Sequence, residues 1–131
     1  MKFCLEPDDG EIDFSPEVVI LAGHTGREPS LVETHIRELE AQGVRPPASV
    51  PEYTIVPAAL LIQSSVVQTP SSRTSGEAEF ALLVDGDAAY VTIASDHTDR
   101  DAEQIDVQLS KRSCATVIGR SVWRLDDVEE R

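Results

Sequence analysis

The segment Glu77–Ile93, EAEFALLVDGDAAYVTI, constrains the fold more than any other part of the chain. Two apolar runs rich in aliphatic and aromatic residues flank the tripeptide DGD, which is a strong signal of a β-hairpin. In an antiparallel pair, the end of one strand lies beside the start of the other. We therefore expect residues around 93–95 to lie opposite residues around 77–79, at the open end of the hairpin.

Further strands are predicted from short apolar runs between turn residues. MKFCLEP and GEIDF surround the turn DDG, and PEVVILAG is typical of a buried strand that ends at Gly23. YTIVPAALLIQSSVVQ predicts a strand, a turn and a second strand, and CATVIG predicts the last strand. The final segment, SVWRLDDVEER, contains no obvious closing element.

Two helices are predicted. The first spans residues 30–42, where Ser30 and Glu33 form a capping box and Gly43 stands at the usual C-terminal position. Its apolar stripe consists of Leu31, Val32, Ile36 and Leu39. The second helix follows the stretch SDHTDRD and runs to Lys111.

Length and charge narrow the fold and the classes of function. The 131 residues suit one domain over residues 1–131, and the elements predict an α+β fold that is mostly β with two helices. Lys and Arg number 11 against 24 Asp and Glu, for a net charge of −13. Because nucleic acids and anionic membranes are bound by basic surfaces, we expect neither as a partner.

The cysteines and the apolar runs predict a cytoplasmic protein. Cys4 and Cys114 are far apart and have no metal-binding spacing, which suits reduced thiols. No apolar run reaches the roughly 18 residues of a membrane span. The N-terminal stretch does not follow the pattern of a signal peptide.

Glu77 and Glu79 open the first strand of the hairpin. Residues at i and i+2 project from the same face of a strand, so these carboxylates lie side by side and raise each other's pKa unless a cation separates them. Mg²⁺ and Mn²⁺ prefer carboxylate oxygens and would resolve the repulsion. The alternative is an ordinary glutamate pair on a solvent-facing edge, and the sequence leaves both readings open.

Asp96 follows the second strand and can complete a three-carboxylate site with Glu77 and Glu79. The alternative is helix capping, with Asp96 or Thr98 as N-cap and the next acids stabilised by the helix dipole. The two readings are compatible, because different residues can serve the two purposes.

His35 and Glu38 lie three positions apart on the first predicted helix and are neighbours on its surface. The carboxylate can orient the imidazole and raise its basicity, so that the pair abstracts a proton or activates a water molecule. The alternative is an exposed pair on an amphipathic helix. All three histidines (His24, His35 and His97) fall in polar stretches, which favours one shared site.

Taken in order along the chain, these residues resemble the fumarylacetoacetate hydrolase superfamily. That superfamily carries an H-x-x-E helix, an E-x-E strand, an N-D-x-x-x-R-D stretch and then a lysine. The matching positions are His35 and Glu38, Glu77 and Glu79, SDHTDRD at residues 95–101, and Lys111. The stretches AGHTGRE, HIRELEAQGV, SGE.E and SDHTDR are more similar still to an uncharacterised bacterial branch labelled as a domain of unknown function.

The resemblance implies a β-rich mixed roll that holds Mg²⁺ or Mn²⁺. The ligands it implies are Glu77, Glu79 and Asp96. It also implies that His35 with Glu38 is the general base, and that Lys111 stabilises a developing enolate or binds a substrate oxygen. The implied enzyme is a hydrolase or lyase that cleaves a C–C bond of, or decarboxylates, a small oxo or diketo acid.

The chain departs from that superfamily in several ways. Val56-Pro57 stands where a Lys-Pro is common, and the connection from Glu79 to Asp96 is a short hairpin. Lys111 is followed by RSC and not by a glycine–aromatic pattern. Related chains continue further, so the chain is expected to be a fragment, a naturally truncated member or a protein that completes its sheet by association. We expect an incomplete roll and a homodimer. The alternative is a non-catalytic truncated member that acts as a dimerising or interaction domain.

Overall fold

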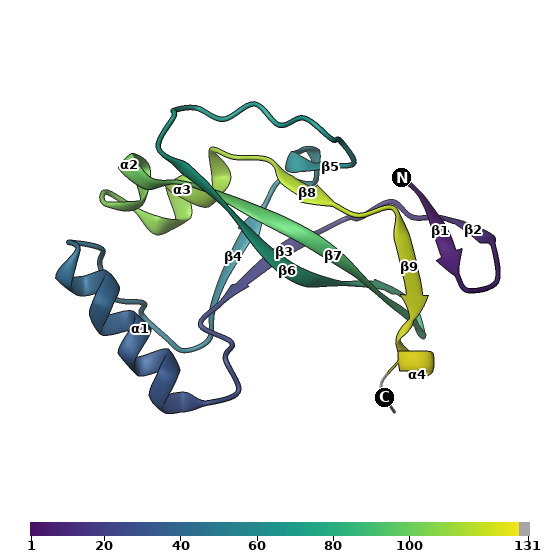
Figure 1. The fold of residues 1–131 in the computed structure, drawn as a ribbon, viewed down its shortest axis with the longest axis horizontal. Helices are drawn as coiled ribbons and strands as arrows, with labels where there is room; N and C mark the ends of the chain where they lie inside the picture. Colours follow the sequence, from purple (N-terminus) through teal and green to yellow (C-terminus); the bar gives the residue numbers. More distant parts are fainter. Residues whose placement is uncertain (129–131) are drawn as a thin grey trace.

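The β6–β7 hairpin runs through the centre of the fold (Figure 1). In this computed structural model, which describes residues 1–128, strands β6 (Thr74–Asp85) and β7 (Ala88–Asp99) pair along their full length. The turn contains Gly86 with φ of 58°, a left-handed conformation that suits glycine in a tight hairpin. The predicted hairpin is confirmed, and residues 77–79 lie opposite residues 94–96, one position beyond the expectation.

Strand β7 is the centre of a seven-stranded mixed sheet in the order β2-β1-β9-β7-β8-β5, with β6 on the other side of β7. The other strands are β1 (Lys2–Glu6), β2 (Gly10–Asp13), β5 (Leu61–Ile62), β8 (Thr116–Ile118) and β9 (Ser121–Arg124). The predicted α+β class and the N-terminal strand pair are confirmed. Strand β9 and helix α4 (Leu125–Val128) occupy the segment where we expected no closing element. The strands within residues 1–128 do not close into a barrel.

The main core is formed by side chains of strands β1, β6, β8 and β9 of this sheet. Alternate residues of β1 are buried, because successive side chains of a strand point to opposite faces. The buried cluster consists of Phe3, Leu5, Leu83, Ile118 and Val122. Gly119 turns the chain between β8 and β9 at a close approach, since an added Cβ would lie 3.0 Å from Thr92 Oγ1.

A second, two-stranded sheet pairs β3 (Val19–Gly23) with β4 (Glu52–Val56). The expectation of a buried strand ending at Gly23 is wrong in its burial: Ile20 on β3 is 57% exposed, and its partner Ile55 on β4 is 60% exposed. Only one face of this ribbon is covered, and there Val56 is 2% exposed. A short 3₁₀ turn, η1 (Ala58–Leu60), then leads to β5.

Helix α1 (Pro29–Ala41) is confirmed, but its predicted N-terminal capping box is wrong. Glu28 is the N-cap residue and makes no side-chain capping bond, while Ser30 lies within the first turn and its hydroxyl bonds the Glu28 carboxylate. Pro29 starts the helix because a first-turn residue needs no backbone N–H donor.

The C-terminus of α1 is closed as predicted by a glycine. Gly43, with φ of 90°, donates to Glu40 O, and Val44 N donates to Leu39 O, which together form a Schellman motif. The predicted stripe is only partly packed: Leu31 is 68% exposed, and no residue within Pro29–Ala41 is fully buried.

The predicted second helix is divided into two short ones, α2 (Arg100–Glu103) and α3 (Val107–Arg112). Asp99 caps α2 by accepting from the amides of residues 101 and 102, and Asp106 caps α3 in the same way. The predictions of Thr98 or Asp96 as N-cap are wrong, because β7 continues to Asp99. The described part of the chain thus has four α-helices and not two, and none of them is long and apolar enough to cross a membrane.

Candidate functional site

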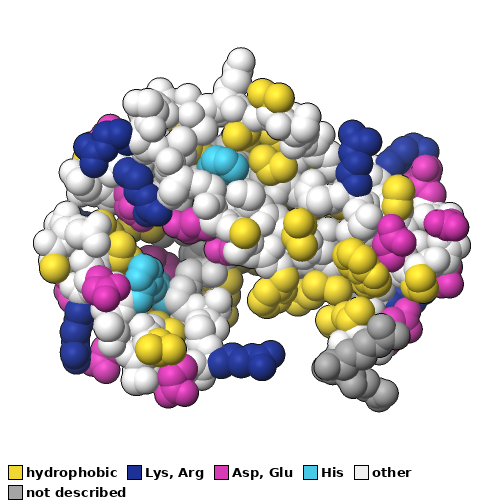
Figure 2. Space-filling model, in the orientation of Figure 1, with side chains coloured by type: hydrophobic (Ala, Val, Ile, Leu, Met, Phe, Trp, Pro, Cys, Tyr) yellow, Lys and Arg dark blue, Asp and Glu magenta, His cyan; other side chains and the backbone are white. Residues whose placement is uncertain are grey.

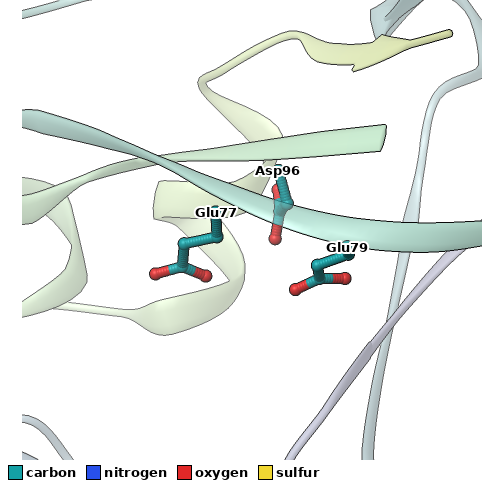
Figure 3. Close-up of side chains that lie close together, drawn as sticks. All are labelled: Glu77, Glu79 and Asp96. Carbon is teal, nitrogen blue, oxygen red and sulfur yellow. The ribbon is translucent and has the colours of Figure 1, made fainter. Parts of the chain in front are cut away.

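The carboxylates of Glu77, Glu79 and Asp96 converge at the open end of the hairpin (Figure 3). The two glutamates share one face of β6, and Asp96 lies opposite Glu77 on β7. One ligand atom from each residue lies within 4.8 Å of the others. The structure therefore brings together the three residues that the sequence predicted as metal ligands.

Asp96 is the buried member of this cluster, with 4% of its surface exposed. Its Oδ2 accepts a hydrogen bond from Lys111 Nζ at 2.5 Å, but its Oδ1 has no partner among residues 1–128. Burial raises the pKa of Asp96, and the adjacent ammonium only partly opposes the shift. A buried carboxylate oxygen without a partner costs roughly 1–3 kcal/mol, and a cation is one partner that relieves this.

Lys111 reaches the cluster from α3 and is 15% exposed at its side chain. Besides Asp96, its ammonium donates to Glu77 Oε2 at 3.2 Å and to Thr98 Oγ1 at 2.8 Å. Burial alone would lower the pKa of Lys111, but the carboxylates of Asp96 and Glu77 outweigh it and raise the pKa. Lys111 is therefore a protonated part of the cluster, and its three hydrogen bonds in this structure go to the protein.

Arg100 is a second cation of the site, which the sequence reasoning missed. Its guanidinium donates to Glu77 Oε1 at 3.0 Å, to Ser75 Oγ at 2.5 Å and to Glu103 Oε2 at 2.7 Å. In the stretch DHTDR, the four-residue separation of Arg100 from Asp96 was the signal that could have identified it. Strand β7 ends three residues after Asp96, so the next residue begins α2 beside the cluster.

Glu79 gives the cluster its excess negative charge. Within residues 1–128 it makes no ion pair, whereas Glu77 contacts both Lys111 and Arg100. Burial raises the pKa of Glu79, and the nearby Asp96 carboxylate raises it further. Three carboxylates thus face two cations, which leaves room for additional positive charge.

A cavity of about 650 Å³ opens in front of the carboxylates and extends to α1. Figure 2 shows a hollow on this side of the molecule, with acidic and histidine side chains beside it. Its ionisable wall residues are His24, His35, Arg45, Glu52, Arg73, Glu77, Glu79, Asp96, Arg100, Glu103 and Lys111. This volume is within the usual range of small-molecule sites.

His35 lines this cavity across from the carboxylates, but Glu38 does not. His35 Nδ1 lies 3.9 Å from Glu38 Oε2, which is beyond hydrogen-bond distance, and the two side chains are 61% and 66% exposed. The sequence placed the two residues correctly as helix neighbours. In the structure the two side chains are exposed and form no hydrogen bond with each other.

His24 also lines the cavity, in a left-handed backbone conformation with φ of 59° that is uncommon outside glycine. Its ring centroid lies 6.2 Å from that of His35. Burial lowers the pKa of His24, and His35 and Lys111 lower it further, against the opposing effect of Glu52. His97, in contrast, lies on the other face of β7, where its Nδ1 is 3.5 Å from Ser95 Oγ.

Comparison with protein families gives one match. Residues 22–131 match the family described as Protein of unknown function (DUF2848), and the chain belongs to this family. No curated protein and no solved structure matches the chain. The predicted membership of a family of unknown function is therefore confirmed, while the link to the fumarylacetoacetate hydrolase superfamily stays a prediction.

Proposed function

We propose that this member of the DUF2848 family is a divalent-metal-dependent hydrolase or lyase of the fumarylacetoacetate hydrolase type, acting on a small oxo or diketo acid. The observation that supports the proposal most is Asp96, whose buried Oδ1 has no partner within residues 1–128 and which adjoins Glu77 and Glu79. Mg²⁺ and Mn²⁺ prefer such oxygen ligands.

The donor set fits an ion of this kind. Ligand oxygens on opposite sides of one ion lie about 4–5 Å apart, given metal–oxygen distances of about 2.0–2.6 Å. The three carboxylate atoms lie within 4.8 Å of one another. No cation within residues 1–128 contacts Glu79, so metal binding by this carboxylate would break no ion pair.

The bound ion would supply Lewis-acid polarisation of the oxo-acid oxygens. In the proposed reaction Lys111 keeps its proton and places a positive charge where negative charge develops on the substrate. In hydrolysis His35 accepts the proton of the attacking water molecule, and in decarboxylation its protonated ring gives a proton to the enolate carbon left when CO₂ departs. Glu38 stabilises the imidazolium once the 3.9 Å gap between the two side chains closes. Arg100 holds the Glu77 carboxylate in position.

A thermal-shift titration with Mn²⁺ and Mg²⁺ tests the metal site. We expect the intact chain to gain several degrees in Tm at saturating metal, because an ion that binds only the folded state stabilises it. The double substitution Glu77→Ala and Glu79→Ala should abolish the gain. Asp126→Ala with Asp127→Ala, which removes two exposed carboxylates of α4, should leave it intact. An intact chain with no metal-induced shift would contradict the proposal.

Turnover of oxaloacetate in the presence of Mn²⁺ tests the reaction class. Loss of oxaloacetate should be faster with the intact chain than with the Glu77→Ala/Glu79→Ala variant, which controls for catalysis by free metal. His35→Gln should lower kcat more than it changes the Kd of Mn²⁺, because His35 is not among the proposed ligands.

An exposed apolar face supports a second candidate, a dimerising member of the family. Phe80, Leu82 and Val84 on β6 are 73%, 51% and 63% exposed, and Ile93 on β7 is 69% exposed. Figure 2 shows apolar side chains gathered along this part of the surface. Contiguous apolar surface of this kind marks association sites, and we propose that a second copy covers it.

Light scattering over a range of concentrations tests that candidate. A homodimer is expected, and Phe80→Lys should dissociate it, whereas Val66→Lys, at an equally exposed loop residue outside this face, should not. A monomer at every concentration would contradict the dimer while leaving the metal site untouched.

A further inference from the structure

A second, shallower groove adjoins the cavity on the side of α1. It has a volume of about 420 Å³ and lies between the first two turns of α1 and the loops at residues 24–26 and 50–51. Its apolar walls are Pro29, Val32, Ile36, Val50 and Pro51. This apolar groove contrasts with the cavity beside it, whose walls carry the carboxylates and their cations.

The groove owes its shape to close packing of a loop on the helix. An added Cβ at Gly26 would lie 2.8 Å from Val32 Cγ2, so glycine lets the loop approach α1 this closely. Val50, on the opposite wall, is 55% exposed. The groove therefore leaves aliphatic surface uncovered, which burial against an apolar group would stabilise.

The two hollows share a wall made of His24, Thr25 and Ile36. His24 stands at the junction, held there by its left-handed backbone at the end of β3. Because burial, His35 and Lys111 lower the pKa of His24 against the effect of Glu52, its ring is mostly neutral near pH 7. A ligand can therefore pass from one hollow to the other without meeting a full charge at His24.

The charges around the groove favour a neutral apolar occupant. Glu33 is the one ionisable group besides His24 in the groove walls within residues 1–128, and its carboxylate is paired with Arg37 Nη2 at 2.5 Å. An anionic tail would be repelled by Glu33, and a cationic tail would compete with Arg37. A hydrocarbon chain carries no charge, so it would neither be repelled by Glu33 nor compete with Arg37.

We infer that this groove binds the apolar tail of an amphipathic 2-oxo acid whose polar head lies at the Glu77–Glu79–Asp96 cluster. The inference rests on the proposed function and specifies its substrate class: an oxo acid with an aliphatic chain. The continuity of the two hollows at His24 and Ile36 carries the argument.

Calorimetric titration of the Mn²⁺-saturated chain with straight-chain 2-oxo acids, from pyruvate to 2-oxooctanoate, tests the inference. We expect the Kd to fall about twofold to fourfold with each added methylene, the range that partial to full burial of a CH₂ group produces. Octanoate, which has the tail but not the oxo group, should bind much more weakly than 2-oxooctanoate. Equal binding of the two, or a Kd independent of chain length, would overturn the inference.

Two variants locate the tail. Val50→Asp places a charge in the groove at an exposed position, and it should remove the gain from chain length while leaving the Kd of pyruvate unchanged. Val66→Asp, which is 74% exposed and outside both hollows, is the matched control and should change neither. A chain-length gain that survives Val50→Asp would place the tail elsewhere and overturn the inference.

The thermal-shift titration with Mn²⁺ and the calorimetric titration together separate this inference from the proposed function. If Mn²⁺ alone produces no thermal shift, the proposed function fails and the inference fails with it. If Mn²⁺ binds but affinity does not depend on the tail, only the inference fails.

Discussion

The two ends of the β6–β7 hairpin have opposite chemistry on one continuous backbone. At the open end, polar groups are buried: Asp96 is 4% exposed and Thr98 fully buried. Toward the turn, apolar groups are exposed, including Phe80 at 73% and Val84 at 63%. The buried face of the open end and the outer face of the turn end thus each invert the usual distribution of polar and apolar side chains.

This inversion marks two places that the stability of an isolated domain does not explain. A buried carboxylate with one free oxygen and an uncovered apolar face are both unfavourable in an isolated domain. Each becomes favourable with a partner: a cation for Asp96, and an apolar surface for Phe80. This difference underlies our proposals of ligand binding at the open end of the hairpin and of association at the turn end.

Substitution of Lys111 should produce the largest effect, at the open end. Lys111→Met removes the cation that contacts Asp96 and leaves a carboxylate with 6% side-chain exposure unpaired. Breaking a buried pair in this way costs about 3–5 kcal/mol of unfolding free energy, which urea denaturation measures. Saturating Mn²⁺ should restore part of this loss.

The chain's other lysine provides the control for that measurement. Lys2 pairs with Glu11 at 2.5 Å, but both side chains are largely exposed. Lys2→Met should leave the unfolding free energy nearly unchanged. Equal stability of the Lys111→Met variant and the parent would show that Asp96 needs no cation, and would remove the contrast between the hairpin ends.

Substitution of two neighbouring leucines of β6 tests whether the two faces of the turn end differ in burial. Leu83 is 2% exposed on the inner face, and Leu82 is 51% exposed on the outer face. Leu83→Ala should lower the unfolding free energy by about 2–5 kcal/mol, because it leaves a cavity in the core. Leu82→Ala should change it by less than about 0.5 kcal/mol in dilute solution. Similar losses from both would mean that the outer face is covered even in the monomer.

Substitution of two arginines should have a smaller effect on the unfolding free energy at the open end. Arg100 is 34% exposed and contacts Glu77, Ser75 and Glu103, whereas Arg73 makes one ion pair with Asp101 and is 62% exposed. Arg100→Gln should lower the unfolding free energy by about 1 kcal/mol, and Arg73→Gln by less. Denaturation at low and high salt checks the assignment, since only ion-pair contributions fade with salt. A larger loss from Arg73→Gln would contradict it.

The smallest effect is a pH dependence from His24. Because the pKa of His24 is lowered in the folded chain, mainly by burial and against the effect of Glu52, the unfolded chain binds this proton more readily. His35 and Lys111 also face His24 and add to this shift. Stability from this group is therefore complete above about pH 6.5 and declines as the pH falls below it.

His24→Gln should flatten the fall of Tm between about pH 7 and pH 5 relative to the parent. His97→Gln, on the other face of β7, is the comparison variant. An unchanged slope in the His24 variant would mean that the ring is as well hydrated in the folded chain as in the unfolded one.

Local patterns predicted the open end of the hairpin well. The tripeptide DGD set the register to within one residue, and the i, i+2 spacing of Glu77 and Glu79 placed both carboxylates on one face. Gly43 likewise marked the end of α1, because the left-handed position there suits glycine. Each of these features depends on a few neighbouring residues.

Features that depend on distant packing were not predicted. The family resemblance placed Lys111 in the site, but no neighbouring residue shows that its ammonium donates to Asp96 and Thr98. The spacing of Arg100 from Asp96 indicates that it lies near the cluster, but not that it donates to Ser75. The predicted burial of PEVVILAG was wrong for the same reason, because an apolar run does not reveal whether one or both faces of its strand are covered.

Helix α1 lacks any fully buried side chain within Pro29–Ala41, and this has a kinetic consequence. Segments with little buried surface open at low free energy, so their amides exchange with solvent long before those of the core. We expect deuterium uptake to be faster in α1 than in β7. We therefore expect one wall of the cavity to open while the carboxylates stay in place, which would let a ligand of the proposed site exchange without unfolding of the sheet.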